Sequence, residues 1–301
     1  TIYVCSHWGN VYNPPAVERL KKRTPPRKRD EIEDLEGKWS DKWGKLYAID
    51  SRNGKIKWVF DPSLNSVSQC GKTNIWGSPA VDTHGTVYFS AFDKKSGYLY
   101  AVKPDGSLKW RYPDNPECSP IEQLTSSVSI SSNGTLYAGS FNFNRRASLY
   151  AFKPDGTLKW RFDGISENRI TAAPSISPDG TIYVGGINWG FSEKPRMSRT
   201  GHMYAIQDRG GRGVLKWKYR VPYGINAAAT IDRDGNLFFG TYSDPVISGT
   251  RGPYYLYALN RHGRKLWSYP LHGRMQSSPV IGRDGTVYIG TTETQAVLYA
   301  F

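Results

Sequence analysis

Residues 149–162 read LYAFKPDGTLKWRF, and the recurrence of this phrase along the chain is the strongest indication of its architecture. Related copies begin at Leu46, Leu99, Met203 and Leu256, and a shortened copy begins at Leu298. A second phrase, SPVIGRDGTVYIG at residues 278–290, alternates with the first, and its other copies begin at Ser78, Ser127, Ala173 and Ala228. Self-similarity at a period of roughly 50 residues is typical of a propeller or a solenoid.

Each repeat predicts four short antiparallel strands. The runs are 4–6 residues long and rich in Val, Ile, Tyr, Phe and Trp, which suit a pleated and half-buried surface. Steps such as Asp284-Gly285 separate the first two strands, and Pro154-Asp155-Gly156 separates the last two. Glycine after Asn or Asp supplies the positive φ of a tight hairpin turn. Four strands per repeat, arranged radially, predict an all-β fold of the β-propeller class.

The number of blades follows from counting the strand patterns. Six copies of the second and third strands are present, but only five of the first and fourth. The chain starts inside one blade at Thr1 and stops inside another at Phe301. We therefore predict one propeller domain over residues 1–301 with six blades visible, and seven or eight blades stay open if the chain is a fragment. Residues 11–43 are a charged insertion into a connection between a second and a third strand.

Five tryptophans share one register of the repeat, one in each fourth strand. This recurrence predicts that they are structural and pack between neighbouring blades. They are Trp58, Trp110, Trp160, Trp217 and Trp267.

The phrase AIDSRNGKIKW at residues 48–58 resembles the tryptophan-docking motif of the pyrroloquinoline-quinone (PQQ) propellers, and the PDGTLKW copies resemble PQQ-like repeats. The resemblance covers the chain outside residues 11–43 and implies a PQQ-like propeller. Family dehydrogenases place two adjacent cysteines beside the quinone and bind calcium, and some add a C-x-x-C-H haem motif. This sequence has no adjacent cysteines and no such motif. We predict no cofactor, with PQQ and calcium left open, because a fold alone does not carry function.

The charge of the chain bears on its partners. The formal net charge is +14, which favours an acidic polymer, an anionic small molecule or an acidic protein partner. No nucleic-acid motif such as RNP1 or paired zinc ligands is present. No apolar run approaches the ~18 residues of a membrane span.

The three cysteines, Cys5, Cys70 and Cys118, match neither a dense disulfide framework nor a C-x-x-C metal site. Cys70 and Cys118 precede equivalent first strands, so they lie on the same connection of successive blades. Either a disulfide between them or two free buried thiols fits this placement.

The variable connections point to the binding surface. The connections from second to third strands, and from one blade to the next, differ in length and emerge on the same face of an up-and-down blade. Function concentrates on loops held by a rigid frame, so we expect ligand-binding residues around the channel mouth on this face. Amide, guanidinium and aromatic groups suit a carbohydrate or a planar carboxylated ligand. The predicted ligand-binding residues are His7, Asn74, Trp76, Gln123, Arg169, Asn188, Trp189, Asn226, Arg274 and Gln276.

Three functional hypotheses remain from the sequence. The first is a non-catalytic binding or scaffold propeller, secreted, periplasmic or at the cell surface as many relatives are. The second is a lyase or hydrolase acting on an acidic carbohydrate at the channel mouth, where His7 with Glu193 or Asp244 could form an acid–base pair. The third is a PQQ-dependent dehydrogenase. We favour the first; no catalytic residue is assigned.

Overall fold

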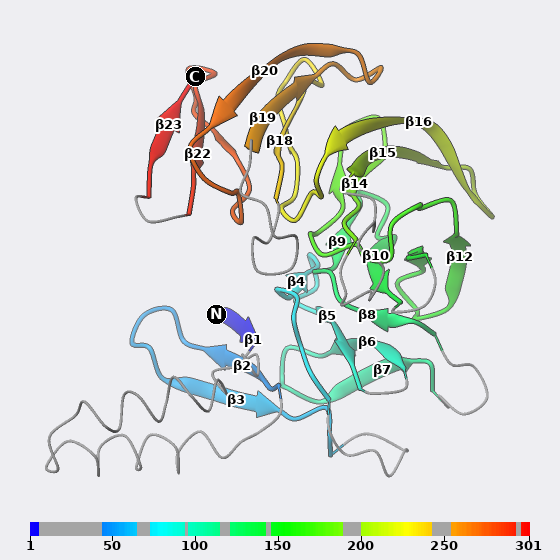
Figure 1. The fold of residues 1–301 in the computed structure, drawn as a ribbon. Helices are drawn as coiled ribbons and strands as arrows, with labels where there is room; N and C mark the ends of the chain where they lie inside the picture. The colour runs from blue at the N-terminus through cyan, green and yellow to red at the C-terminus, as the bar shows by residue number, and fades with distance from the viewer. Residues whose placement is uncertain are drawn as a thin grey trace, which may run out of the picture.

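The computed structural model describes residues 1–5, 44–64, 73–93, 96–114, 121–142, 146–188, 200–242, 254–292 and 296–301. These residues form 23 strands joined by turns and loops. The strands make six antiparallel sheets, which follow one another in chain order around an arc (Figure 1). The protein is therefore an all-β propeller, and we number its six sheets as blades 1 to 6. The predicted insertion at residues 11–43 and the residues Cys70 and Cys118 lie outside the described part of the chain.

The blades are built in the predicted strand order. Blade 1 contains β1 (Ile2–Cys5), β2 (Leu46–Ile49) and β3 (Ile56–Phe60). Blade 2 contains β4 (Ala80–Val81), β5 (Val87–Phe92), β6 (Gly97–Val102) and β7 (Leu108–Tyr112). Blade 3 contains β8 (Gln123–Leu124), β9 (Ser129–Ile130), β10 (Leu136–Phe141), β11 (Leu149–Phe152) and β12 (Leu158–Phe162).

The other three blades repeat this pattern. Blade 4 contains β13 (Ser175–Ile176), β14 (Thr181–Gly185), β15 (Thr200–Asp208) and β16 (Gly213–Pro222). Blade 5 contains β17 (Thr230–Ile231), β18 (Leu237–Gly240), β19 (Tyr254–Leu259) and β20 (Lys265–Leu271). Blade 6 contains β21 (Val280–Ile281), β22 (Val287–Gly290) and β23 (Leu298–Ala300).

The first strand of each repeat is shorter than predicted. The five first strands, β4, β9, β13, β17 and β21, each span two residues, against the four to six expected. In blades 2, 4 and 6 a proline immediately precedes the first strand, and proline has no N–H to extend the ladder. On the other side the chain turns at once into the second strand.

The tight turns have the predicted backbone conformation. Gly285 has φ +88° between the first and second strands of blade 6, and Gly156 has φ +92° between the third and fourth strands of blade 3. Only glycine enters this region without steric cost, so the Asp-Gly steps of the sequence fix where the strands reverse. We call the side that carries these tight turns the turn face. The opposite side, which carries the connections from second to third strands and from blade to blade, is the loop face.

The tryptophans of the fourth strands contact the turn of the following blade. Trp58 Nε1 donates to Pro104 O at 2.9 Å, Trp110 Nε1 to Pro154 O at 3.0 Å, and Trp217 Nε1 to Arg261 O at 3.0 Å. Glycine makes this approach feasible, since a Cβ on Gly106 would stand 2.8 Å from the Trp58 ring. Trp160 packs against Gly213 and is 4% exposed. These contacts join each blade to the next on the turn face.

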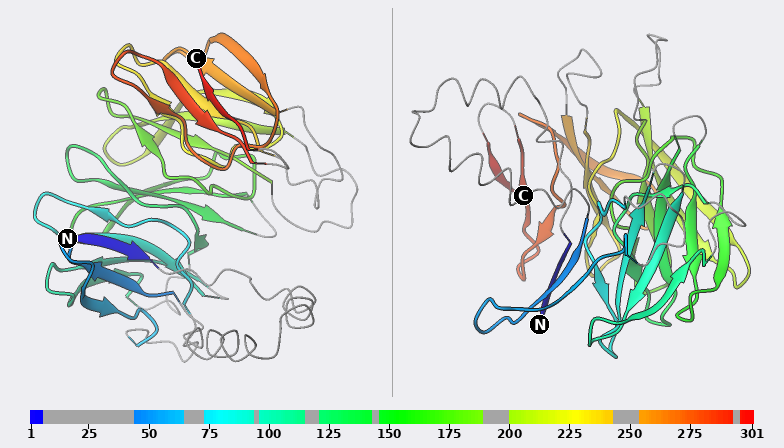
Figure 2. Two further views of the ribbon diagram at one scale, coloured as in Figure 1. Left: turned by 90° about the vertical axis from the view of Figure 1, so that its left-hand side faces the viewer. Right: turned by 90° about the horizontal axis from the view of Figure 1, so that it is seen from below.

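The first and last blades have three strands each and lie on the same side of the molecule, with no described strand pairing them (Figure 2). Their apolar side chains are more exposed than the equivalents in complete blades. Val4 is 44% exposed whereas Phe89 in blade 2 is fully buried, and Leu298 is 74% exposed whereas Leu149 in blade 3 is fully buried. Trp267, which faces blade 6, is 36% exposed and packs beside Phe301 at 5.8 Å between ring centroids. The best-covered core therefore runs through blades 2 to 5.

Candidate binding face

One position on the loop face recurs in five blades with the same backbone pairing. A residue six positions before the first strand pairs with the residue eighteen positions later, which lies at the end of the second strand or two residues beyond it. The pairs are Asn74 with Phe92, Gln123 with Phe141, Arg169 with Ile187, Gly224 with Tyr242 and Arg274 with Thr292. The frame is thus the same in each blade while the side chain it presents differs. We call these five leading residues the mouth positions.

Arg169 is the mouth residue with the most contacts described. Its guanidinium carbon lies 4.6 Å from the centroid of the Trp76 ring and 5.3 Å from that of Phe141, within the range of cation–π attraction. Arg169 is 5% exposed, and burial lowers its pKa to about 10. Trp76 is 38% exposed and meets Phe92 edge to face at 4.7 Å. The arginine therefore lies beneath an aromatic surface, and Trp76 is the part that faces solvent.

Arg274 holds the same position in blade 6. Its guanidinium carbon lies 5.7 Å from the centroid of the Tyr242 ring, which is 4% exposed. Arg274 itself is half-buried, and Gln276 two residues later is exposed. A second cation thus rests on an aromatic ring of the preceding blade, with more access to solvent than Arg169.

Two of the predicted amide residues form hydrogen bonds to the backbone of neighbouring segments. Gln123 Nε2 donates to Asp93 O at 2.8 Å, and Asn188 Oδ1 accepts from the backbone N–H of Asn168 at 3.2 Å. Asn74 and Asn226 are half-buried. The remaining predicted site residues, His7 and Trp189, lie outside the described ranges, as do Glu193 and Asp244 of the predicted acid–base pair. Their role stays a prediction.

A buried carboxylate on the loop face of blade 4 was not predicted. Glu167 lies in the connection from blade 3 to blade 4 and is 1% exposed. Its Oε1 is 2.7 Å from His202 Nδ1, and its Oε2 accepts from the Tyr204 hydroxyl at 2.7 Å. The backbone N–H of Ser166 donates to the Tyr204 hydroxyl oxygen at 2.9 Å, and the Ser166 hydroxyl lies 2.5 Å from the same oxygen. Burial raises the pKa of Tyr204, so its hydroxyl stays protonated and donates to the carboxylate.

Glycine makes room for this carboxylate. Gly186 pairs with His202 across the second and third strands of blade 4, and a Cβ on Gly186 would stand 2.3 Å from Glu167 Oε2. The equivalent position carries a side chain in blades 2, 3, 5 and 6. Those residues are Ala91, Ser140, Thr241 and Thr291.

A related cluster in blade 3 has different chemistry, and its glutamate stands one position later in the repeat than Glu167 does. Glu122 lies in the connection that enters blade 3, and its Oε2 accepts from the hydroxyl of Tyr150, the residue equivalent to Tyr204. There Arg161 NH1 lies 3.8 Å from Glu122 Oε1, and the Ser148 hydroxyl, at the position of His202, lies 3.4 Å from the same oxygen. The glutamate–tyrosine contact is therefore repeated, but the histidine and the glycine are particular to blade 4. The sequence signal that could have found it is a histidine at a position where the other five blades have Lys45, Tyr98, Ser148, Tyr255 and Val297.

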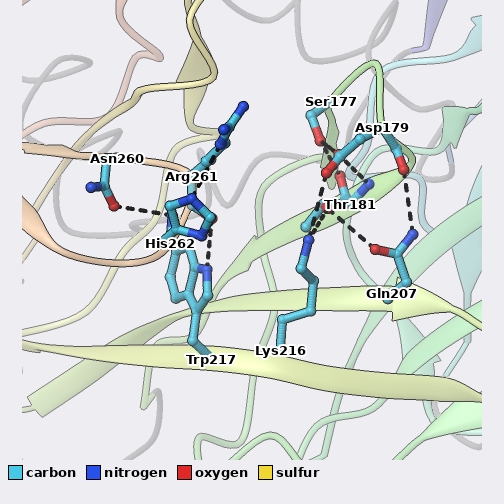
Figure 3. A network of polar contacts seen from close by, with 9 residues as sticks. All are labelled: Ser177, Asp179, Thr181, Gln207, Lys216, Trp217, Asn260, Arg261 and His262. Carbon is cyan, nitrogen blue, oxygen red and sulfur yellow. Dashed lines mark hydrogen bonds and ion pairs between the residues drawn. The ribbon is translucent and has the colours of Figure 1, made fainter.

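The polar contacts on the turn face have another character. Lys216 Nζ lies 3.5 Å from Asp179 Oδ2 and donates to Thr181 Oγ1 at 2.8 Å, linking the fourth strand of blade 4 to the turn between its first two strands (Figure 3). Ser177 Oγ donates to Asp179 Oδ1 at 2.5 Å in the same turn. These contacts join turns to strands, and they repeat the local chemistry of the Asp-Gly step. We assign them to the frame.

Two further findings bear on ions and membranes. Within the part of the chain that the structure describes, no three His, Cys, Asp or Glu side chains gather in a way that would hold a metal ion. In the same residues, no helix has the length and apolarity needed to cross a membrane.

Comparisons with known proteins give distant likenesses only. No protein-family model matches the chain, and no curated protein matches it. A protein of unknown function from Bacteroides caccae is 11% identical, with 79% of each chain covered and a TM-score of 0.42. The quinohemoprotein alcohol dehydrogenase ADHIIG from Pseudomonas putida HK5 is 12% identical, with a TM-score of 0.46. The match covers 82% of this chain and 59% of the dehydrogenase. At these values neither likeness bears on activity, and the resemblance of the repeat phrases to PQQ-like repeats stays an expectation from the sequence.

Proposed function

We propose that the protein is a binding propeller that takes an anionic ligand or an acidic partner on its loop face. The observation that carries this proposal is the set of mouth positions. Five blades share one backbone pairing there, yet the residues presented are Asn, Gln, Arg, Gly and Arg. A frame that repeats its packing residues has no need to vary this position, whereas an asymmetric ligand requires different groups around the ring.

The chemistry of these positions supports the ligand class. Two arginines on aromatic rings give fixed positive charge, and the exposed face of Trp76 gives a surface for a sugar or another planar group. The net charge of +14 adds a long-range field that attracts anions and raises their association rate. A propeller of this kind working outside the cytoplasm would meet acidic polysaccharides, and we include export in the proposal.

A binding screen tests the proposal. The full chain is titrated with acidic polysaccharides and with neutral polysaccharides of similar length, at low and at near-physiological salt. We expect saturable binding to at least one acidic polymer, weakened by salt because exposed charges are screened, and no binding to the neutral set. Equal affinity for acidic and neutral polymers would contradict the proposal.

A further inference from the structure

The Glu167–His202 pair has the arrangement of a proton-transfer site. A buried carboxylate beside Nδ1 of an imidazole fixes the ring orientation and the tautomer, with the proton on Nδ1. The other ring nitrogen, Nε2, then has a lone pair available. The side chain of His202 is 16% exposed, while that of Glu167 is 2% exposed. The imidazole of the pair is therefore partly accessible to solvent, while its carboxylate partner lies inside.

A structural role alone does not explain this pair. Blade 3 places a glutamate from the neighbouring register position, Glu122, beside Tyr150, Ser148 and Arg161 and uses no histidine. Blade 4 instead buries a carboxylate against an imidazole and removes the side chain at Gly186 to admit it. Burying a carboxylate is costly unless its oxygens are well bonded, and here both oxygens are bonded to groups that orient the ring.

The pair is connected to the mouth positions through the backbone of blade 4. Gly186 N–H donates to His202 O at 2.9 Å, and the next residue, Ile187, donates its N–H to Arg169 O at 3.0 Å. Glu167 precedes Arg169 by two residues in the same connection. A ligand held over Trp76 and Arg169 therefore lies on the face where His202 emerges.

We propose that His202, positioned by Glu167, is the base of an elimination reaction on uronate units of an acidic polysaccharide. This inference rests on the proposed anion-binding function. Nε2 of His202 takes the proton from C5, next to the carboxylate of the sugar. The electron pair forms a C4=C5 double bond, the C4–O bond breaks, and the leaving oxygen receives a proton from water or from the imidazolium. The reaction consumes no oxidant.

The groups of this face suit elimination better than glycoside hydrolysis. Hydrolysis uses two carboxyl groups that flank the bond, one of them free to donate a proton or attack. Glu167 is buried and accepts from His202 and Tyr204 through its two oxygens, so it is already engaged. Elimination instead needs a base and positive charge to stabilise the developing carbanion. Arg169 contributes such a charge in a surrounding of low dielectric, where its influence extends further than in water.

The test measures binding and product for the same set of polyuronates. The wild-type chain should release unsaturated products, seen by the ultraviolet absorbance of the new double bond. His202→Asn keeps an N–H donor near the place of Nδ1 but has no basic nitrogen, so we expect binding and melting temperature to be kept and product formation to fall by at least about 100-fold. Binding of a polyuronate without any unsaturated product, or full activity of His202→Asn, would overturn the proposal.

Glu167→Gln tests the positioning role. It should lower kcat roughly 10-fold and leave KM unchanged, because a neutral amide no longer fixes the orientation and tautomer of the imidazole. The matched variant Glu122→Gln makes the same change beside Tyr150 in blade 3 and should leave kcat and KM unchanged. An unchanged kcat for Glu167→Gln would remove Glu167 from the site. If no acidic polysaccharide binds at all, the proposed anion-binding function fails as well, which separates the two outcomes.

Discussion

The turn face and the loop face of this propeller use the same repeat in opposite ways. On the turn face, Trp58, Trp110 and Trp217 donate to the next blade with distances that agree within 0.1 Å, at 2.9, 3.0 and 3.0 Å. On the loop face, five positions share one backbone pairing and are occupied by four different residue types. The difference indicates where function should be sought in this repeat protein. The repeated tryptophan contacts hold the blades together, and the varied mouth positions are where we propose that a ligand or partner binds.

The largest effect should come from removing a tryptophan contact. Trp160 is 4% exposed and packs on Gly213, so Trp160→Ala should lower the free energy of unfolding by about 3–5 kcal/mol. Trp267 is 36% exposed, so Trp267→Ala should cost less than half of that. Denaturant unfolding measures both. Equal losses for the two variants would mean that burial against the next blade is not what gives these residues their role.

A smaller effect should follow from filling the space beside Glu167. A Cβ on Gly186 would stand 2.3 Å from Glu167 Oε2, so Gly186→Ala should displace the carboxylate and cost about 1–3 kcal/mol. Gly211, in a turn-face hairpin, has no atom within 4 Å of an added Cβ. Gly211→Ala should change stability by no more than about 0.5 kcal/mol. Thermal melting of the two variants measures both effects. An unchanged melting temperature for Gly186→Ala would show that the Glu167 cluster can accommodate the added methyl group.

The turn face should also weaken in acid. Burial alone would raise the pKa of Asp208, but hydrogen bonds from Lys159 and Tyr137 to its carboxylate help to lower it overall. A carboxyl whose pKa is lower in the folded state stabilises the fold above its unfolded pKa of about 3.9. That stabilisation is lost as the pH falls through the folded pKa.

Melting curves of Asp208→Asn against wild type test this prediction. The variant should melt at a lower temperature near neutral pH, by an amount equivalent to about 1 kcal/mol. The gap should narrow as the pH falls below the unfolded pKa of about 3.9 and the wild-type carboxyl takes up its proton. A gap that is independent of pH would assign the loss to packing instead of to charge.

The sequence predicted the parts of the fold that are encoded locally. Asp284-Gly285 and Pro154-Asp155-Gly156 specify their own turns, and the strand pattern between them gave the four-stranded blade. The two-residue first strands were not predicted, since an immediate turn limits their length in every blade and a preceding proline adds to this only in blades 2, 4 and 6. The Glu167–His202 pair was missed because its members lie 35 residues apart and meet only when the connection folds over blade 4. His7 was singled out from sequence, whereas His202 was not, although its register departs from that of Tyr98 and Ser148.

The most direct test of the anion-binding face compares two arginines of blade 6 by calorimetric titration. Arg274 is a mouth residue, while Arg283 lies in the tight turn on the opposite face and is exposed. Arg274→Ala and Arg283→Ala remove the same charge, so the long-range field changes equally. With the acidic polymer that binds best, Arg274→Ala should weaken affinity by about 1.5–3 kcal/mol, the value of a hydrogen bond to a charged group. Arg283→Ala should bind as the parent does. Equal affinities for the two variants would contradict binding at the mouth positions.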